Sequence, residues 1–235
     1  MSEHDEPSAV RERYARRAAH DSRYGPFNPA ALRERQGRQR ALLQMLAARG
    51  LADLAALKLV EVGCGAGGNL LEFLQLGFAP EHLQGIELLP ARHAAARHVL
   101  PAATVLWLGD ASVESTAPIA PASQDLVLAA TVFSSLLDDA FQQRLADAMW
   151  RWLRPGGAVL CYDFTVNNPR NADVRGVPVQ RMQALFPQGR MVWRRLTLAP
   201  PLARAVCRVH PALHGVLDAL PLLRTHALAV ISKPE

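Results

Sequence analysis

The feature that most constrains this chain is a cluster of glycines that directly follows a short apolar run. Residues 57–62 are mostly apolar, and Gly63, Gly65 and Gly67 come next, ahead of a segment with helical spacing at 69–76. A short apolar run bounded by glycines is typical of a parallel strand buried on both faces. Glycines at its end let the backbone adopt positive φ and approach a ligand closely. The segment therefore predicts a strand that turns into a helix beside a bound ligand.

Segments of strand and helix character alternate beyond the glycines. The helical segments show apolar residues at three- to four-residue spacing, as in Leu145, Met149 and Trp152. Such alternation predicts an α/β fold, a doubly wound Rossmann-like sheet with helices on both faces. We expect strands at residues 57–62, 83–88, 104–108, 125–131, 158–164, 191–198 and 225–232, and helices at 69–76, 91–99 and 140–153.

The length of 235 residues fits one domain with a substrate-facing elaboration. We expect residues 1–50 to form a helical cover segment, with helices at 9–20 and 30–49. Residues 51–235 then form the main domain. Within it, residues 165–224 are interpreted as the elaboration, and the proline-broken helices at 202–223 as a lid over an acceptor pocket.

Composition narrows the classes of partner and compartment. The formal net charge is +5 and nearly all basic residues are arginines, which favours a solvated basic surface over nucleic-acid binding. The acidic N-terminus lacks the pattern of a signal peptide, and no apolar run approaches the roughly 18 residues of a membrane span. Three widely spaced cysteines indicate neither a disulfide framework nor a metal site. We therefore expect a cytoplasmic protein.

The glycines alone fit two cofactor classes. Gly63, Gly65 and Gly68 also satisfy the dinucleotide-binding fingerprint. Glu61 precedes the first glycine by two residues, where its carboxylate could face the ammonium of an amino-acid-like cofactor and would repel a pyrophosphate. Glu87, at the end of the second expected strand, can accept both hydroxyls of a ribose, which either class requires.

Asp110 follows the third expected strand, between Gly109 and Ala111. An acid there can accept a hydrogen bond from an adenine amino group. The alternative for Asp110 is the N-cap of a helix, because Asp is among the preferred caps.

Taken together, these motifs resemble the class I S-adenosylmethionine-dependent methyltransferases over residues 57–164. The segment Leu-Arg-Pro-Gly-Gly before the fifth expected strand is particularly informative. We interpret it as a turn in which Pro155 stops a helix while Gly156 and Gly157 reverse the chain. The motifs that carry the resemblance are the acid and glycines of 61–67, Gly-Ile-Glu at 85–87, Gly-Asp-Ala at 109–111, Asp-Leu-Val at 125–127 and this segment at 153–157.

The resemblance implies a mostly parallel seven-stranded sheet with an antiparallel last strand, and S-adenosylmethionine as the cofactor. It also implies which parts of the chain hold which parts of the cofactor. The implied contacts are Glu61, Gly63 and Gly65 for the methionine part, Glu87 for the ribose, Asp110 and Ala111 for the adenine, and Ala130 and Thr131 beside the sulfonium, with Cys64, Gly67, Asn69 and Leu88 completing the set.

Methyl transfer is an in-line displacement, so the enzyme mainly has to hold nucleophile, methyl and sulfur in line. A hydroxyl acceptor also needs a general base, whereas an ionised carboxylate needs none. Asp163 is our first catalytic candidate, because open α/β folds bind ligands at the carboxyl ends of their strands. The other catalytic candidates are Tyr24, Tyr14 and His210, and further acceptor-side candidates are Ser134, Ser135, His214 and His226.

The acceptor is expected to be a small molecule or glycan. An anionic acceptor would suit the arginines of residues 167–195, whose alternative role is a solvated face. The helices expected at 202–223 are basic and amphipathic, so peripheral contact with an anionic lipid surface is an alternative role for them. Residues 162–234 resemble, more weakly, methyltransferases encoded among bacterial polysaccharide genes. The region after the fourth expected strand lacks the Asn-Pro-Pro-Tyr signature of nucleic-acid amino-group methyltransferases, which lowers the case for DNA.

Three hypotheses follow. The first is an S-adenosylmethionine-dependent methyltransferase that acts on an oxygen of a small molecule, sugar or natural-product precursor. The second is an NAD-dependent oxidoreductase, which the glycine spacing and Glu87 favour and Glu61 opposes. The third is a non-catalytic adaptor that retains the fold and binds a partner through its arginine-rich tail.

Overall fold

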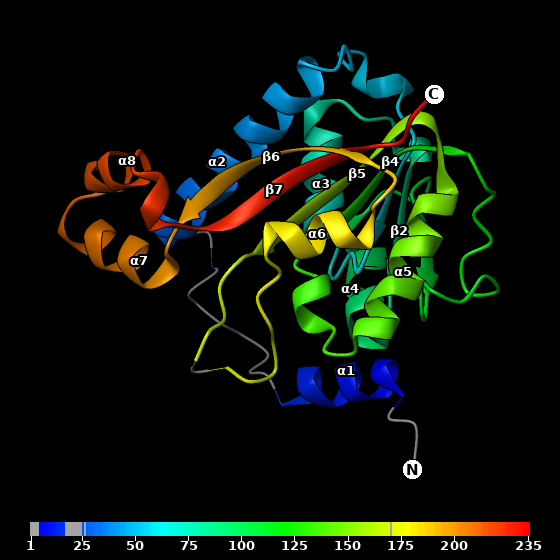
Figure 1. Ribbon diagram of the computed structural model, residues 1–235, viewed down its shortest axis with the longest axis horizontal. Helices are drawn as coiled ribbons and strands as arrows, with labels where there is room; N and C mark the ends of the chain where they lie inside the picture. Colours follow the sequence, from blue (N-terminus) through cyan, green and yellow to red (C-terminus); the bar gives the residue numbers. More distant parts are fainter. Residues whose placement is uncertain (1–4, 17–24, 26, 170) are drawn as a thin grey trace.

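The protein is built around one seven-stranded sheet, seen in a computed structural model that describes residues 5–16, 25, 27–169 and 171–235 (Figure 1). The strand order is β3-β2-β1-β4-β5-β7-β6. Strands β1 to β5 run parallel, and β7 is antiparallel to both of its neighbours, which confirms the predicted fold class. The strands are β1 (Leu59–Val62), β2 (Leu83–Glu87), β3 (Val105–Leu108), β4 (Gln124–Ala130), β5 (Leu153–Phe164), β6 (Arg190–Leu198) and β7 (Arg224–Ser232).

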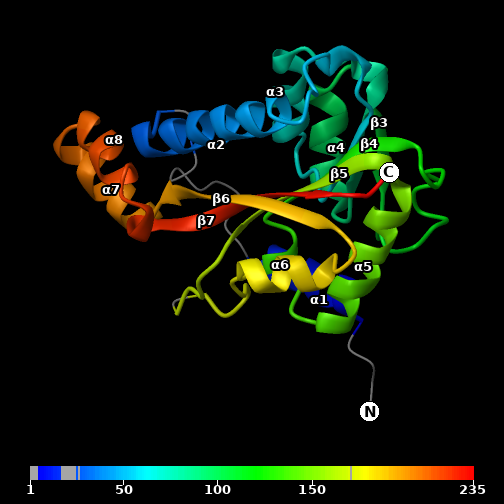
Figure 2. The ribbon, with the colours of Figure 1, turned by 45° about the horizontal axis from the view of Figure 1, so that its top comes forward.

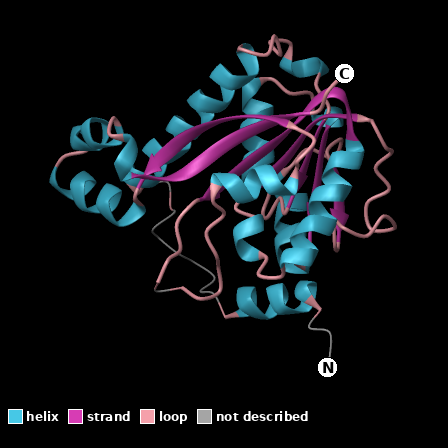
Figure 3. Ribbon diagram, viewed as in Figure 1, coloured by secondary structure: helices cyan, strands magenta, loops and turns pink. Residues whose placement is uncertain are grey.

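Helices cover both faces of this sheet (Figure 3). Helices α2, α3 and α4 contribute to an apolar cluster on one face, and α1, α5 and α6 contribute to the cluster on the other. The helices are α1 (Glu6–Ala15), α2 (Pro29–Ala47), α3 (Gly68–Leu76), α4 (Pro90–Val99), α5 (Asp139–Trp152), α6 (Val179–Leu185), α7 (Pro200–Val209) and α8 (Ala212–Asp218), with 3₁₀ turns η2 (Leu54–Ala56), η3 (Pro80–His82), η4 (Phe133–Ser135) and η5 (Pro221–Leu223).

Local sequence signals explain where the two longest helices begin. Pro29 occupies the first turn of α2, and the Asn28 side chain accepts a hydrogen bond from the amide of Ala30 at 3.0 Å. Asp138 caps α5 in the same way, accepting from the amide of Phe141 at 2.8 Å. Both helices lie where the sequence predicts them.

The segment 153–157 differs from the predicted turn. Helix α5 ends at Trp152, before Pro155 is reached, and residues 153–157 are the irregular start of β5. Gln124 pairs with Leu153, whereas the next aligned pair is Leu126 with Ala158, so extra β5 residues bulge out of the ladder. Residue 157 must be glycine, because a Cβ there would lie 2.9 Å from the Asp125 carbonyl oxygen. The segment is therefore a bulge and not a chain reversal.

Two helical segments depart from the sequence prediction. Helix α1 starts three residues before the predicted 9–20 segment, and residues 17–20 of that segment lie outside the described residues. Helix α6, between β5 and β6, was not predicted. Its burial of Met182 and Leu185 under β7 and α5 shows that tertiary packing stabilises this short helix.

The predicted short helices at 202–223 are α7, α8 and η5. They form a lobe that projects beyond the carboxyl end of β6 (Figure 2). A small apolar cluster of Ala30, Leu198, Ala203 and Cys207 holds the lobe against α2. No helix in the described part of the chain is long and apolar enough to cross a membrane.

Candidate cofactor and acceptor site

The glycine loop after β1 has the conformation that its sequence predicts. Gly63, Gly65 and Gly67 have φ of 65°, 58° and 83°, which L side chains rarely adopt. Space is also limited, because a Cβ on Gly67 would lie 2.9 Å from Leu100, and one on Gly65 would lie 2.5 Å from the guanidinium of Arg92. The loop therefore depends on glycine both for its dihedral angles and for its close contacts.

Glu61 lies in β1, two residues before the first glycine of this loop, and is 1% exposed. One carboxylate oxygen, Oε1, accepts a hydrogen bond from the Asn69 amide group at 2.6 Å. The other, Oε2, is buried and has no hydrogen-bond partner among the described residues. Burial raises the pKa of Glu61 to about 7, which the bond from Asn69 partly opposes. A buried carboxylate oxygen without a partner fits the ammonium of a methionine moiety.

Glu87 lies at the end of β2 and is also almost fully buried. Its Oε2 accepts from the amide of Gly65 at 2.7 Å and its Oε1 from the amide of Leu89 at 2.8 Å. Each oxygen keeps a second lone pair. Glu87 therefore fixes the glycine loop to β2 and still has the acceptor capacity that two ribose hydroxyls need.

Asp110 stands at a turn and not at a helix N-cap. Its Oδ1 accepts from the amide of Ser112 at 2.8 Å, and residues 109–123 form turns between β3 and β4. Gly109 before it has a φ of 137°, and Ala111 after it is buried. The second carboxylate oxygen of Asp110 has no hydrogen bond within the described residues, as a contact with adenine would require.

The remaining predicted contacts surround the same loop. Ala130 ends β4, and Thr131 beyond it has a φ of 56°. The Thr131 amide donates to the Tyr162 carbonyl at 2.7 Å, which holds the ends of β4 and β5 together. Cys64 is buried in the loop, and burial raises the pKa of its thiol far above the usual range. Leu88 packs against the cluster that contains α5.

Arg92 and Tyr14 cover the loop, a contact that no sequence pattern predicts. The Arg92 guanidinium of α4 lies close to Gly65 and 5.2 Å from the ring centroid of Tyr14 on α1. The Tyr14 hydroxyl lies 3.4 Å from Oγ of Ser135 in η4. Tyr14 therefore lies beside the glycine loop, and its catalytic role stays a prediction. Tyr24 lies outside the described residues.

Asp163 is fully buried at the end of β5. Its oxygens accept from the amides of Ser134 and Phe164, each at 3.0 Å. Burial raises its pKa to about 7, against the lowering effect of the hydrogen bonds from Ser134 and Phe164. In this arrangement Asp163 positions η4 beside the end of β4, and a direct role on an acceptor stays a prediction.

The histidine candidates differ in their surroundings. His210 follows α7 on the exposed side of the lobe, where its Nδ1 accepts from the amide of Ala212 at 3.2 Å. His226 stacks on Tyr162 with ring centroids 5.2 Å apart, and burial lowers its pKa to about 4. His210 is therefore far less enclosed than His226, which belongs to the packing of β5 and β7.

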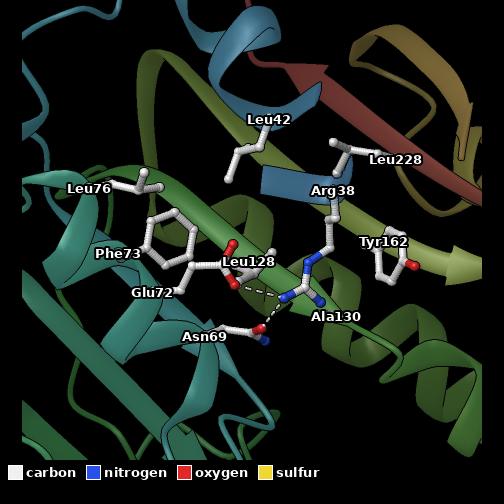
Figure 4. Close-up of a pocket in the computed structure, with 10 residues that line it drawn as sticks. All are labelled: Arg38, Leu42, Asn69, Glu72, Phe73, Leu76, Leu128, Ala130, Tyr162 and Leu228. Carbon is white, nitrogen blue, oxygen red and sulfur yellow. Dashed lines mark hydrogen bonds and ion pairs between the residues drawn. The ribbon is translucent and has the colours of Figure 1, made fainter. Parts of the chain in front are cut away.

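Arg38 of α2 points toward Asn69 and Glu72 of α3 (Figure 4). Its Nη2 donates to Oδ1 of Asn69 at 2.8 Å and lies 3.0 Å from the Glu72 carboxylate. Its guanidinium also lies 5.3 Å from the centroid of the Tyr162 ring. Arg38 is one of four arginines in α2, and their spacing did not identify which of them faces the sheet.

Comparisons with known proteins place this geometry in a family. Residues 60–161 match a family model described as a methyltransferase domain. A comparison with curated proteins finds no match. Among solved structures, a SAM-dependent methyltransferase from Archaeoglobus fulgidus has a TM-score of 0.59 at 12% identity, over 86% of this chain and 98% of its own.

Two further structures share the fold. A methyltransferase of the same cofactor dependence from Mesorhizobium loti has a TM-score of 0.56 at 16% identity, over 82% of this chain and 98% of its own. The [4+2]-cyclase SpnF has a TM-score of 0.57 at 17% identity, over 85% of this chain and 82% of its own. Together with the family match, these likenesses confirm the resemblance drawn from the sequence. Residues 60–161 match the methyltransferase family model, and the fold around them is the Rossmann-like fold of the S-adenosylmethionine-dependent methyltransferases named above.

Proposed function

We propose that this protein transfers a methyl group from S-adenosylmethionine to an oxygen atom of a small molecule, sugar or natural-product precursor. The observation that supports it most concerns Glu61. Its Oε2 is buried, has no hydrogen-bond partner in the described part of the chain, and lies just before a loop of three glycines with positive φ. That oxygen suits an ammonium and would repel the pyrophosphate of a dinucleotide. The NAD-dependent alternative is correspondingly weakened.

The residues of the protein bind the cofactor and orient the acceptor. S-adenosylmethionine supplies the electrophilic methyl group, carried on a sulfonium. Glu61 binds the ammonium end, Glu87 the ribose and Asp110 the adenine, while Ala130 and Thr131 at the end of β4 border the reacting centre. Holding the acceptor in line with the methyl group accounts for most of the rate enhancement that such a site can provide.

The choice of oxygen rests on the segment after β4. Nucleic-acid amino-group methyltransferases show an Asn-Pro-Pro-Tyr type of signature there, whereas this chain has Ala130, Thr131, Val132 and Phe133. An ionised carboxylate accepts a methyl group without a general base, and a hydroxyl needs one. The full burial of Asp163 favours acceptors of the first kind.

A transfer assay tests this proposal. The purified protein is incubated with methyl-labelled S-adenosylmethionine and a panel of carboxylates, sugars, phenols and amines, and the labelled product is located by mass spectrometry. We expect label on oxygen, with one S-adenosylhomocysteine formed per methyl transferred and with loss of transfer in Glu61→Gln. The fold alone does not decide this point, because SpnF shares it and is described as a cyclase. Tight cofactor binding with no transfer to any acceptor would support the adaptor hypothesis instead.

A further inference from the structure

A second cleft lies outside the cofactor site, between α2, β6 and the lobe of α7 and α8. Its volume is about 420 Å³, which is within the range of small-molecule sites. One wall is the face of α2 that carries Arg33, Gly37 and Arg40. The other walls come from residues 194–197 of β6, from α8 and from Arg224.

The α2 wall has a gap between two arginines. Gly37 lies in the middle of α2, and a Cβ built on it would meet no atom within 4 Å. Glycine in a helix interior destabilises the helix by about 1 kcal/mol relative to alanine. Arg33 and Arg40 stand four residues before and three residues after it, so all three lie on one helical stripe. Neither guanidinium has a hydrogen bond or ion pair among the residues that the structure describes.

His214 of α8 is a second sign of a ligand in this cleft. Its side chain lines the cleft and is 5% exposed, and its Nε2 is buried with no hydrogen-bond partner in the described structure. Burial lowers the pKa of His214, so the imidazole is neutral at neutral pH and its Nε2 can donate or accept one hydrogen bond. A buried polar atom of this kind normally has a partner.

The acidic residues of the cleft do not neutralise these arginines. Asp218 is paired with Arg224, which also donates to its carbonyl oxygen at 2.6 Å. Burial raises the pKa of Glu34 to about 7, so this side chain carries only part of a negative charge at neutral pH. The unpaired charge in the cleft is therefore positive.

Arg38 connects the cleft with the cofactor site. It lines both the cleft and the small cavity of Figure 4, where Asn69 joins it to Glu61. Arg38 is already held by Asn69 and Glu72 and forms the shared wall. Arg33 lies five residues further along α2, a distance of roughly 7.5 Å along the helix axis. The cleft is therefore adjacent to the cofactor site, with Arg38 between the two.

We infer that this cleft binds an oxyanion of the methyl acceptor, a carboxylate or a phosphate, between Arg33 and Arg40 over Gly37. Guanidinium groups bind such oxyanions through paired, charge-assisted hydrogen bonds. The inference rests on the proposed function for the identity of the ligand as the acceptor. Two arginines of the 167–195 stretch, Arg175 and Arg181, are otherwise engaged, since both contact Asp139 of α5.

Titration with two probe anions tests the inference. Inorganic pyrophosphate represents a phosphate acceptor and malonate a carboxylate acceptor, and each is titrated calorimetrically into the full chain at low salt. We expect saturable binding of at least one probe, and the stronger of the two identifies the oxyanion. Arg33→Gln and Arg40→Gln should each weaken it about ten-fold, because a charge-assisted contact is lost.

Substitutions of Gly37 give a second, charge-specific comparison. Gly37→Glu should abolish anion binding, whereas Gly37→Gln, of equal size, should weaken it much less, and Gly37→Ala should leave it within two-fold. Arg190→Gln is the matched control, because it removes the same charge from the exposed start of β6. Equal weakening by Arg190→Gln and Arg33→Gln would show nonspecific attraction and overturn the inference.

S-adenosylhomocysteine is titrated into the same proteins to separate the two proposals. Its affinity should stay unchanged in the Arg33, Arg40 and Gly37 variants, since these residues do not line the glycine loop. Binding of S-adenosylhomocysteine without saturable binding of either anion overturns the inference and leaves the proposed function intact. Anion binding without S-adenosylhomocysteine binding overturns the proposed function, and with it the role of the cleft as an acceptor site.

Discussion

Glu61 and Glu87 approach the glycine loop from neighbouring strands, yet their hydrogen bonds differ. Both oxygens of Glu87 accept backbone amides, from Gly65 and Leu89. Glu61 has one oxygen bonded to Asn69 and one without a partner among the described residues, and burial raises the pKa of Glu61 to about 7. Glu87 therefore holds the loop in place without a ligand, whereas Glu61 has an oxygen that can bind a cation.

The raised pKa of Glu61 predicts a pH-dependent affinity for the cofactor product. A bound ammonium stabilises the ionised carboxylate, so the pKa of Glu61 should fall on binding and a proton should be released below pH 7. The affinity for S-adenosylhomocysteine should therefore rise by up to about ten-fold per pH unit toward pH 7 and then level off. Calorimetry between pH 5.5 and 8 measures this. Glu61→Gln should bind weakly without that slope, and an unchanged slope in this variant would contradict the assignment.

Replacement of Glu87 tests the ribose contact. Glu87→Ala removes the acceptor for two backbone amides and for the ribose hydroxyls, and we expect S-adenosylhomocysteine to bind about 100-fold more weakly, the loss of two or more hydrogen bonds. Glu87→Gln keeps one carbonyl oxygen and should lose less. Unfolding curves measured without ligand show how much of the loss in affinity comes from destabilisation of the glycine loop. Equal affinity of Glu87→Ala and the unaltered protein would exclude the contact.

At the scale of elements, α1 is held over the end of β4 by a buried ion pair. Glu6 Oε1 accepts from Arg13 at 2.6 Å and from the amide of Leu137 at 2.7 Å, and Arg13 also donates to the Ser135 carbonyl at 3.0 Å. Breaking a buried pair by removing one partner destabilises by about 3–5 kcal/mol. This contact therefore decides whether α1 stays docked beside the glycine loop.

Arg13→Leu should release α1 without unfolding the sheet. Hydrogen exchange in residues 6–15 should become faster, because a docked helix exchanges through local opening, while exchange in β4 and β5 should not change. Arg11→Leu is the matched control, since Arg11 is exposed on the same helix. Unchanged protection of residues 6–15 in Arg13→Leu would show that other contacts hold the helix.

The bulge at the start of β5 makes a separate prediction about stability. A Cβ on Gly157 would lie 2.9 Å from the Asp125 carbonyl oxygen and 3.0 Å from that of Arg154. Gly157→Ala should lower the free energy of unfolding by about 1–3 kcal/mol, the usual effect of overpacking. Gly215→Ala in α8, where the Cβ has open space, should be neutral or stabilising. Urea denaturation compares the two, and equal stability would argue against the bulge geometry.

The positions of β6 and β7 in the sheet agree with their composition. Residues 227–231 are continuously apolar and buried, as an interior strand requires, while β6 carries arginines and remains exposed, as an edge strand can. The place of β7 between β5 and β6 was thus readable from composition. The bulge at 153–157 was not, because proline and glycines signal an interruption of regular structure without saying whether the chain turns or bulges.

Side-chain direction was the part of the site that the sequence could not provide. Glu61, the glycines and Glu87 are fixed by their positions at strand ends, so periodicity alone brings them together. Arg38 and Arg92 reach the site from helices, and their direction depends on how α2 and α4 pack on the sheet. Asp163 was placed correctly at a strand end, but its full burial follows from η4 folding over it.

For the whole molecule, the cofactor site and the acceptor cleft lie along one edge of the sheet. The glycine loop is at the carboxyl ends of β1 and β2, and the lobe of α7 and α8 stands beyond the end of β6 (Figure 1). Helix α2 spans the region between them and contributes Arg38 to both cavities.

Calorimetric titration of the ligand-free protein with S-adenosylhomocysteine, and separately with NADH, shows which cofactor the glycine loop binds. We expect one S-adenosylhomocysteine to bind per chain, with a dissociation constant on the order of micromolar, because the buried carboxylate of Glu61 receives an ammonium. We expect no saturable binding of NADH. Binding of NADH with no heat from S-adenosylhomocysteine would contradict this expectation, since the glycine loop would then serve a dinucleotide.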